Sequence, residues 1–458
     1  MASSASPPGR PRRHFVAVAW SIIGLVTALI MLLQSVSGAP ELDQDDTSFN
    51  DTMLQLEARL AVAQQMLVPG SGDEVVAQMN LGRPARRLRV SAIAAVVDGP
   101  EAAREVLRSI HVSSGAYPLT SDEMDLLADL DAVYAGDSAE STQREVEESL
   151  GWFGQLAVAA SKPGDDPSPF LTQVRHQAVI LMFTLSGVIL GLGVLGLIGL
   201  IFLILIAVRM ARSTHTHMIN QLDAHDGVYA ETFALWMVIF PLLLFGLSAL
   251  SSSLWVVSLG FMISMVALLW PLRRGCRWTQ VRVDIGWTAP ACWFSECGRG
   301  FLGYAMGIPI VAIGLMMTVV LITLASPEGG SSSVGHPVVN DVAGSDWWGR
   351  VPVLMLAVVA APVVEETMFR GVLYRHLRSA TRFQRWGVSV VVSAILTGLI
   401  FAAIHPQGVL AIPVLASMGF ALALAREWRG SLMVPIMMHA LSNGITMTLL
   451  ILMVGDLS

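Results

Sequence analysis

Charged residues are scarce in this chain. They make up 14% of its 458 residues, whereas hydrophobic residues make up 54%. An ordinary soluble domain carries about 25% charged residues. This shortage disfavours a single soluble globular enzyme.

Cysteine is almost missing as well. The three cysteines, Cys276, Cys292 and Cys297, are too few for a disulfide framework. Cys292 and Cys297 lack the two-residue spacing and the partner ligands that zinc sites usually show, so we expect free thiols. Outside the positions that flank long apolar runs, the sequence has no compact basic patch. This disfavours nucleic acid as a partner.

The acidic residues are concentrated in one part of the chain. Residues 40–177 hold 23 Asp and Glu against 10 Lys and Arg, a net charge of −13, whereas the other residues carry a net charge of +6. The chain therefore combines an acidic, water-facing insert with a basic and apolar remainder. A capping box at 120–123 and apolar periodicity predict that the insert is helical, with further helices around 51–67, 100–110 and 141–155.

Long apolar runs predict the membrane spans, because crossing about 30 Å of hydrocarbon takes about 20 apolar residues in a helix. Nine windows reach or approach that length. The sequence thus predicts an all-α, polytopic membrane helical bundle with an extracytoplasmic helical insert domain. The windows are 15–37, 178–208, 232–250, 254–272, 301–325, 350–365, 386–404, 409–425 and 431–454.

Arginine placement orients this bundle. Three arginines lie within residues 1–14 and acidic residues follow the first window, so the positive-inside rule places residues 1–14 in the cytosol and 40–177 outside. We expect residues 15–37 to be an uncleaved transmembrane anchor, since their apolar run is long for a signal peptide, which is the alternative. Residues 178–272 then form transmembrane helices 2–4, and a bacterial inner membrane is the expected location.

Three sets of polar residues interrupt the apolar runs near the C-terminus. Ionisable residues inside membrane helices are costly and are functional by default. Each set also has a simpler interpretation: a salt bridge at a helix end, an interfacial histidine, or a hydrogen bond between helices. Together they would assemble one buried site for hydrolysis, with a carboxylate as general base to a water. The sets are Glu365 and Glu366 with Arg370, then His405, then His439 with Asn443.

Helix geometry separates the two glutamates. Residues 351–377 can be drawn as one helix, on which Glu366 and Arg370 lie four residues apart on one face and can pair. Glu365 then points about 100° away and is free for other partners.

The position of His405 strains this arrangement. His405 is 20 residues from Arg385, or about 30 Å along a straight upright helix, which is twice the depth expected of Glu365. We therefore expect the hairpin that carries His405 to tilt and to kink near Gly398 or Pro413.

Three short motifs carry a resemblance to a known family. Residues 365–370 read E-E-x-x-x-R, residues 401–405 read F-x-x-x-H, and residues 439–443 read H-x-x-x-N. In this order, on three apolar helices, they resemble the CPBP family of intramembrane proteases, which includes CAAX-prenyl endopeptidases and bacteriocin-processing relatives. The resemblance implies a CPBP-like protease core over residues 285–454, with the acidic insert and the first helix outside it.

The resemblance also implies roles for the first two motifs. Glu365 looks like the general base that activates a water molecule, with His405 as its partner around that water. Glu366 and Arg370 look like supporting groups.

The third motif and the cofactor follow from the same resemblance. His439 and Asn443 look like ligands or donors to the developing oxyanion. Zinc is one implied cofactor, held by Glu365, His405 and His439 with an open water position. A metal-free, glutamate-activated water is the other possibility, since the sequence lacks the H-E-x-x-H spacing of most zinc proteases.

The implied function is an intramembrane endopeptidase that hydrolyses a membrane-associated peptide or protein within the lipid bilayer. One alternative is a catalytically silent family member that acts as a binding or immunity-type membrane protein. A proton-coupled transporter is the other alternative, but no internal repeat relates two halves of the chain.

A reporter fused after Gly164 tests the predicted topology. We expect the reporter to behave as extracytoplasmic, because one span separates it from a cytosolic N-terminus. The same reporter fused after Arg274 serves as the control and should behave as cytosolic. Cytosolic behaviour at Gly164 would overturn the topology.

Overall fold

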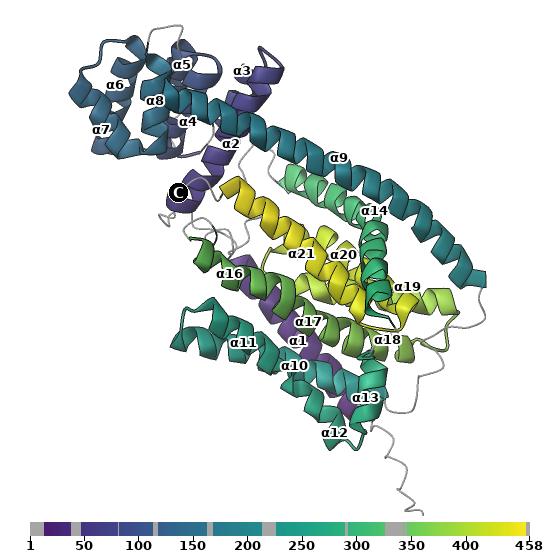
Figure 1. Ribbon diagram of the computed structural model, residues 1–458. Helices are drawn as coiled ribbons and strands as arrows, with labels where there is room; N and C mark the ends of the chain where they lie inside the picture. The colour runs from purple at the N-terminus through teal and green to yellow at the C-terminus, as the bar shows by residue number, and fades with distance from the viewer. Residues whose placement is uncertain are drawn as a thin grey trace, which may run out of the picture. The chain divides into compact units, whose positions relative to one another are not determined.

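The computed structural model describes residues 13–37, 47–80, 82–112, 118–162, 168–212, 226–288, 292–325, 342 and 346–454. Every regular element within these residues is a helix, which confirms the predicted all-α class (Figure 1). Contacts group the chain into two units. The insert unit comprises Asp45–Leu190, and the membrane unit comprises the described residues before it, those from Gly191 to Ala325, and those from 342 to 454.

The insert unit is a helical domain with its own core. Leu130, Phe153 and Leu156 are among its most deeply buried side chains. Its helices are α2 (Thr47–Leu67), α3 (Gly72–Met79), α4 (Pro84–Val97), α5 (Pro100–Val112), α6 (Ser121–Ala135), α7 (Glu140–Leu150), α8 (Trp152–Ser161) and the first turns of α9 (Pro169–Arg212).

The capping box predicted at the start of α6 is confirmed. Thr120 Oγ1 accepts a hydrogen bond from the backbone N–H of Glu123, and the Glu123 carboxylate accepts one from the backbone N–H of Thr120. The helix ends at Gly136, whose φ of 79° is the left-handed conformation that glycine adopts most easily. Local chemistry therefore fixes both ends of this helix.

Two features of the insert differ from the prediction. The helix expected around 141–155 is divided at Gly151, whose φ of 54° turns the chain between α7 and α8. Helices α3 and α4 were not predicted. Helix α4 is buried on most of its surface, including Arg87 and Ser91, so its sequence lacks the apolar stripe that identifies a half-exposed helix.

Nine helical segments among the described residues are long and apolar enough to cross a membrane, in agreement with the nine predicted windows. The segment predicted to begin at residue 178 begins earlier, as α9 runs without interruption from Pro169. The other segments are α1 (Arg13–Ser37), α10 (Asp226–Leu250), α11 (Leu254–Ser264) with η2 (Met265–Leu269) and α12 (Trp270–Arg273), α14 (Trp293–Ala325), Trp347–Ala380, α19 (Trp386–Ala403), η5 (Val409–Ala411) with α20 (Ile412–Arg429), and α21 (Met433–Val454).

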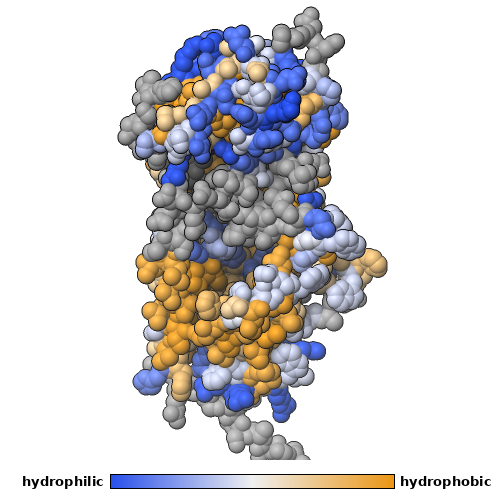
Figure 2. Space-filling view, turned by 90° about the vertical axis from the view of Figure 1, so that its left-hand side faces the viewer, coloured by the Kyte–Doolittle hydropathy of each residue, from blue (hydrophilic) through white to orange (hydrophobic). Residues whose placement is uncertain are grey.

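The surface of the membrane unit agrees with this assignment. Figure 2 shows apolar side chains gathered in a broad band, with hydrophilic side chains at one end of it. Large apolar residues such as Leu197, Phe245 and Leu324 are exposed within the spans. An exposed apolar belt of this kind is what a bilayer covers.

The helix that carries the two glutamates contains two wide turns. The stretch Trp347–Ala380 is continuous through Pro362, as predicted, but consists of α16 (Trp347–Met355), η3 (Leu356–Ala360), α17 (Ala361–Glu366), η4 (Thr367–Leu373) and α18 (Tyr374–Ala380). Both η3 and η4 are π-helical, and such turns occur frequently at functional sites. Pro362 has no N–H to donate, which accounts for the altered hydrogen bonding just before α17.

Of the two places where a kink was expected, Gly398 lies within an unbroken helix, whereas near Pro413 the 3-10 turn η5 leads into the first turn of α20. Helix α19 runs without a break from Trp386 to Ala403, and Gly398 instead lets α20 approach closely. A Cβ atom on Gly398 would lie 2.6 Å from the carbonyl oxygen of Ala416, and one on Gly419 would lie 2.7 Å from Gly398 Cα. Small residues at such crossings let membrane helices come into backbone contact. His405 lies beyond the end of α19, in the turn that leads to η5.

Residues 45–165 produced alone should form a soluble, helical domain, because the core of the insert unit lies almost wholly within them. Circular dichroism and thermal unfolding measure this. A random-coil spectrum would instead identify a disordered acidic segment.

Tyr134 provides a sharper test of the insert core. Its buried hydroxyl lies 3.0 Å from Ser91 Oγ, and burial raises the pKa of Tyr134 above its ordinary value. The folded domain therefore resists ionising this phenol, so stability should fall as the pH rises above about 10, where the unfolded tyrosine ionises. Tyr134→Phe should be less stable by about 1 kcal/mol at neutral pH and should lose part of that pH dependence. Arg144→Ala, an exposed change, is the control.

Candidate active site

Glu366 is completely buried and uses one oxygen for two partners. Its Oε1 atom accepts hydrogen bonds from Arg370 Nη1 and from His439 Nδ1, each at 2.8 Å. Arg370 is also fully buried and donates through Nη2 to the carbonyl oxygen of Gly419 at 3.1 Å. The pairing of Glu366 with Arg370 was predicted from their spacing, whereas the bond to His439 was not. A buried ion pair needs such additional hydrogen bonds to offset its desolvation.

The ring of Phe401 forms one wall of the site. Arg370 Cζ lies 4.6 Å from its centroid, and the centroids of the His405 and His439 rings lie 4.1 and 6.0 Å away. A guanidinium over an aromatic face is attracted by the ring quadrupole. Phe401 therefore contacts the arginine and both histidines at once.

Hydrogen bonds orient both histidine rings in the same way. His405 Nδ1 lies 2.5 Å from the carbonyl oxygen of Phe401, and His439 Nδ1 lies 2.8 Å from the Glu366 carboxylate. Both partners accept, so each Nδ1 carries a hydrogen and each Nε2 is presented to the site. A carboxylate or carbonyl behind a histidine commonly fixes its tautomer in this way.

Glu365 lies where the two Nε2 atoms converge. Its Oε2 atom is 3.7 Å from His405 Nε2 and 3.8 Å from His439 Nε2. Among the described residues this buried oxygen has no hydrogen-bond partner. Both separations exceed direct hydrogen-bond range, so this oxygen can accept a hydrogen bond from a water molecule. The structure thus brings together Glu365, His405 and His439.

Asn443 makes a different contact from the one expected. The sequence placed it in one cavity with Glu365 and the histidines, but its Nδ2 atom donates to the carbonyl oxygen of Ala357 at 2.8 Å. Ala357 lies in the π-helical turn η3, where the backbone pattern is irregular. This hydrogen bond of Asn443 therefore links α21 to η3.

The donor set has the chemistry of a zinc site but not its spacing. Tetrahedral ligands at about 2.0–2.2 Å from zinc lie about 3.3–3.6 Å from one another. The two Nε2 atoms are farther than this from Glu365 Oε2. Within the described part of the chain no group of three His, Cys, Asp or Glu side chains is arranged to hold a metal ion. The spacing is thus slightly wider than that of zinc ligands, and the zinc site stays a prediction.

Two further hydrogen bonds near the site were not predicted from the sequence. Gln34 of α1 donates to the carbonyl oxygen of His405 at 2.6 Å, and Trp287 Nε1 donates to Thr367 Oγ1 at 3.0 Å. A glutamine at the end of an apolar run carries no distinctive signal. Gly419 does carry a sequence signal, because a glycine inside an apolar helix indicates that another helix approaches closely.

Several arginines near the C-terminal end of the glutamate-bearing helix are buried. Arg378 binds both oxygens of Glu427 at 2.9 and 3.0 Å, and Arg375 pairs with Asp284 at 3.2 Å. Both arginines are 1% exposed. These bidentate and buried pairs join α18 to α20 and to α13 (Trp278–Ile285), and so fix the helix that carries the glutamates.

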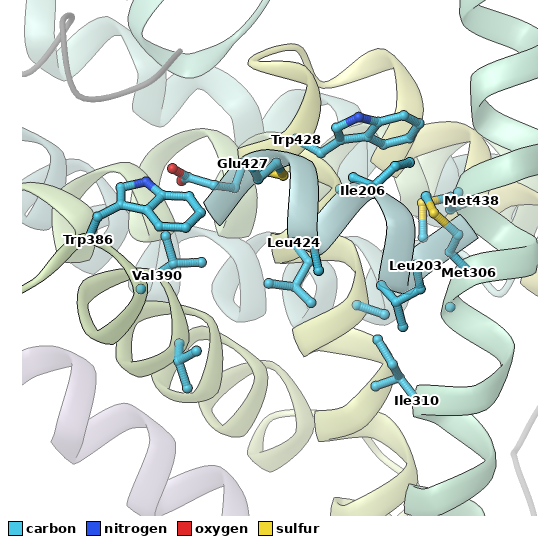
Figure 3. Close-up of a pocket in the computed structure, with 18 residues that line it drawn as sticks. Leu203, Ile206, Met306, Ile310, Trp386, Val390, Leu424, Glu427, Trp428 and Met438 are labelled. Carbon is cyan, nitrogen blue, oxygen red and sulfur yellow. The ribbon is translucent and has the colours of Figure 1, made fainter. Parts of the chain in front are cut away.

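One cavity of the membrane unit is not lined by Glu365, Glu366, His405 or His439. It has a volume of about 200 Å³, and its wall is almost entirely apolar (Figure 3). The residues labelled around it are Leu203, Ile206, Met306, Ile310, Trp386, Val390, Leu424, Glu427, Trp428 and Met438. The carboxylate of Glu427 is already engaged by Arg378, so this cavity offers no second catalytic constellation.

A set of buried carboxylates and histidines on apolar helices defines an integral membrane protein with a hydrolase-like site. Residues 347–445 match the family described as Type II CAAX prenyl endopeptidase, Rce1-like. This segment holds all six candidate site residues, and the match confirms the resemblance drawn from the three motifs.

Two curated relatives are each similar to part of this chain. The membrane-embedded CAAX protease MroQ of Staphylococcus aureus (strain USA300) is 34% identical over 96 residues, which cover 21% of this chain and 38% of the relative. An uncharacterized 24.3 kDa protein of Escherichia coli is 32% identical over 88 residues, which cover 19% of this chain and 38% of the relative. The chain therefore spans 38% of the length of each of these relatives. No solved structure matches it.

Glu366→Gln should destabilise the membrane unit strongly. The change leaves the buried charge of Arg370 without its counter-ion, and breaking a buried pair from one side costs about 3–5 kcal/mol. Denaturant unfolding in detergent measures the loss. Arg385→Leu removes an exposed charge from the same unit and should change the stability by less than about 0.5 kcal/mol. Equal effects of the two variants would contradict a structural role for the pair.

Proposed function

We propose that this protein is an intramembrane endopeptidase that hydrolyses a membrane-associated peptide or protein by means of a water activated by Glu365. The observation that carries the proposal is the buried Glu365 Oε2 atom, which has no hydrogen-bond partner among the described residues and faces two oriented Nε2 atoms. The family match over residues 347–445 supports a protease. An integral membrane location is supported by the same match and by the apolar helices.

Glu365 acts as the general base. A water between Glu365 and the two rings gives a proton to the carboxylate, while its oxygen forms a bond to the carbonyl carbon of the peptide and the carbonyl electron pair moves to oxygen. The proton then passes to the peptide nitrogen as the carbon–nitrogen bond breaks. The side chain of Glu365 is 14% exposed and that of His405 17%, which leaves the site a route to water.

His439 is the group best placed to stabilise the developing negative charge. Its Nδ1–H is held by Glu366, as a carboxylate holds the histidine of a hydrolase triad, so that its Nε2 can carry a proton toward the oxyanion. Arg370 supplies the counter-charge of Glu366 through their 2.8 Å contact. Asn443 remains in the proposal as a second donor, because its amide nitrogen has one hydrogen beyond the bond to Ala357.

His405 positions the water. The Phe401 carbonyl orients its ring through Nδ1, and its Nε2 lies 3.7 Å from Glu365 Oε2. Loss of this ring should disturb water placement while leaving the buried ion pair intact.

The proposal further includes a bacterial inner membrane, a cytosolic N-terminus and an extracytoplasmic insert.

Glu365→Gln should lower cleavage at least about 100-fold, because general base catalysis contributes about 10²–10⁴-fold. The assay uses the purified full chain in liposomes with two probes, a transmembrane peptide that carries a fluorophore and a quencher, and a farnesylated CAAX peptide. Thr446→Ala is the matched control, since that exposed hydroxyl bonds only its own helix. Full activity of Glu365→Gln would refute the proposed base.

The same experiment separates the alternatives. If the protein only binds a partner, Glu365→Gln keeps its phenotype. If it is a transporter, Glu365→Gln loses coupled proton flux, and neither form cleaves a peptide. Zinc measured in the same preparations, with His405→Ala and His439→Ala beside the unchanged protein, tests the predicted metal site.

A further inference from the structure

Helix α1 lies outside the segment that matches the protease family, yet it contacts the site. One face of α1 packs on α10, with Ala19 and Ile23 buried, whereas Leu25 and Leu32 on other faces are exposed. A simple membrane anchor needs no polar contact with the rest of the protein. Helix α1 makes two such contacts.

The two contacts lie at opposite ends of the packed face. Trp20 Nε1 donates to His376 Nε2 at 3.2 Å, and Gln34 Nε2 donates to the carbonyl oxygen of His405 at 2.6 Å. Trp20 and Gln34 are 14 residues apart, which is close to four helical turns and about 21 Å along the axis. Both side chains therefore leave the helix on nearly the same side.

The Gln34 contact falls on the turn that carries a site residue. Helix α19 ends at Ala403, and the last carbonyl groups of a helix have no partner within it. The His405 backbone N–H is held by Ala402, and its ring by the Phe401 carbonyl, so both of these contacts come from α19 itself. Gln34 supplies the contact from a different helix.

We propose that Gln34 is a positioning residue for His405, and that α1 is a brace of the active site as well as an anchor. The proposal rests on the proposed function for its catalytic consequence. The amide of Gln34 holds the carbonyl of His405 against α1 and thereby fixes the distance of its ring from Glu365. This role requires that α1 stay with the membrane unit, which favours the uncleaved anchor over a removed signal peptide.

The catalytic consequence is a loss of turnover without a loss of binding. A catalytic group displaced by about 1 Å can cost about 100-fold in rate, and Gln34 controls the backbone rather than the substrate. Gln34→Glu keeps the shape but removes the donor, and Gln34→Leu removes all polarity. We expect kcat to fall about 10-fold in both variants, with KM unchanged. Gln34→Asn retains the amide and should recover part of kcat.

The control is the neighbouring Ser35→Ala. Ser35 is exposed, and its hydroxyl bonds the carbonyl of Met31 within the same helix. This variant should leave kcat, KM and the unfolding midpoint unchanged. Equal midpoints in the Gln34 variants would separate a local effect on the site from general destabilisation.

Hydrogen exchange tests the brace without any substrate. In full-length protein in liposomes, amide exchange over residues 404–411 should rise at least about threefold in Gln34→Glu and Gln34→Leu but not in Ser35→Ala. Unchanged exchange would overturn the brace, and raised exchange with unchanged kcat would overturn the positioning role. If the unchanged protein cleaves neither probe, the proposed function fails on those probes, whereas the exchange experiment still decides whether α1 holds the turn.

Discussion

The buried carboxylate of Glu366 is the constraint on which the site depends. A charge inside membrane helices is costly unless it is paired and hydrogen-bonded. Glu366 meets this requirement by binding Arg370 and His439 through one oxygen, and Arg370 in turn reaches Gly419 on α20. Three helices, the one carrying Glu366, α20 and α21, are thereby held in one arrangement.

This constraint gives two adjacent, chemically identical residues different tasks. Glu366 binds a cation and a ring through its Oε1 atom, whereas Glu365 Oε2 makes no hydrogen bond to a described residue and lies near the Nε2 atoms of both histidines. Helical rotation alone points them about 100° apart. The partners that tertiary packing supplies on each side then make one carboxylate structural and leave the other available for chemistry, which is how environment separates acid–base roles.

The helices around the site associate in the ways that are typical of helices in lipid. Since lipid is as apolar as leucine, helices associate through close backbone contact and polar bonds more than through burial of apolar surface. The crossing of Gly398 and Gly419 provides the first, and the buried pair of Arg378 with Glu427 provides the second. Both contacts involve α20, so this helix is held to α19 and to α18.

The sequence by itself determined the features that depend on local chemistry. Apolar run length determined the nine spans, the capping box determined the start of α6, and four-residue spacing determined the pairing of Glu366 with Arg370. Only the tertiary structure decided that His439 binds Glu366, that Asn443 binds Ala357, and that Gln34 reaches His405. The residues in each of these pairs are separated by at least 73 positions. Contacts between distant helices depend on how their faces rotate and approach, which no local pattern encodes.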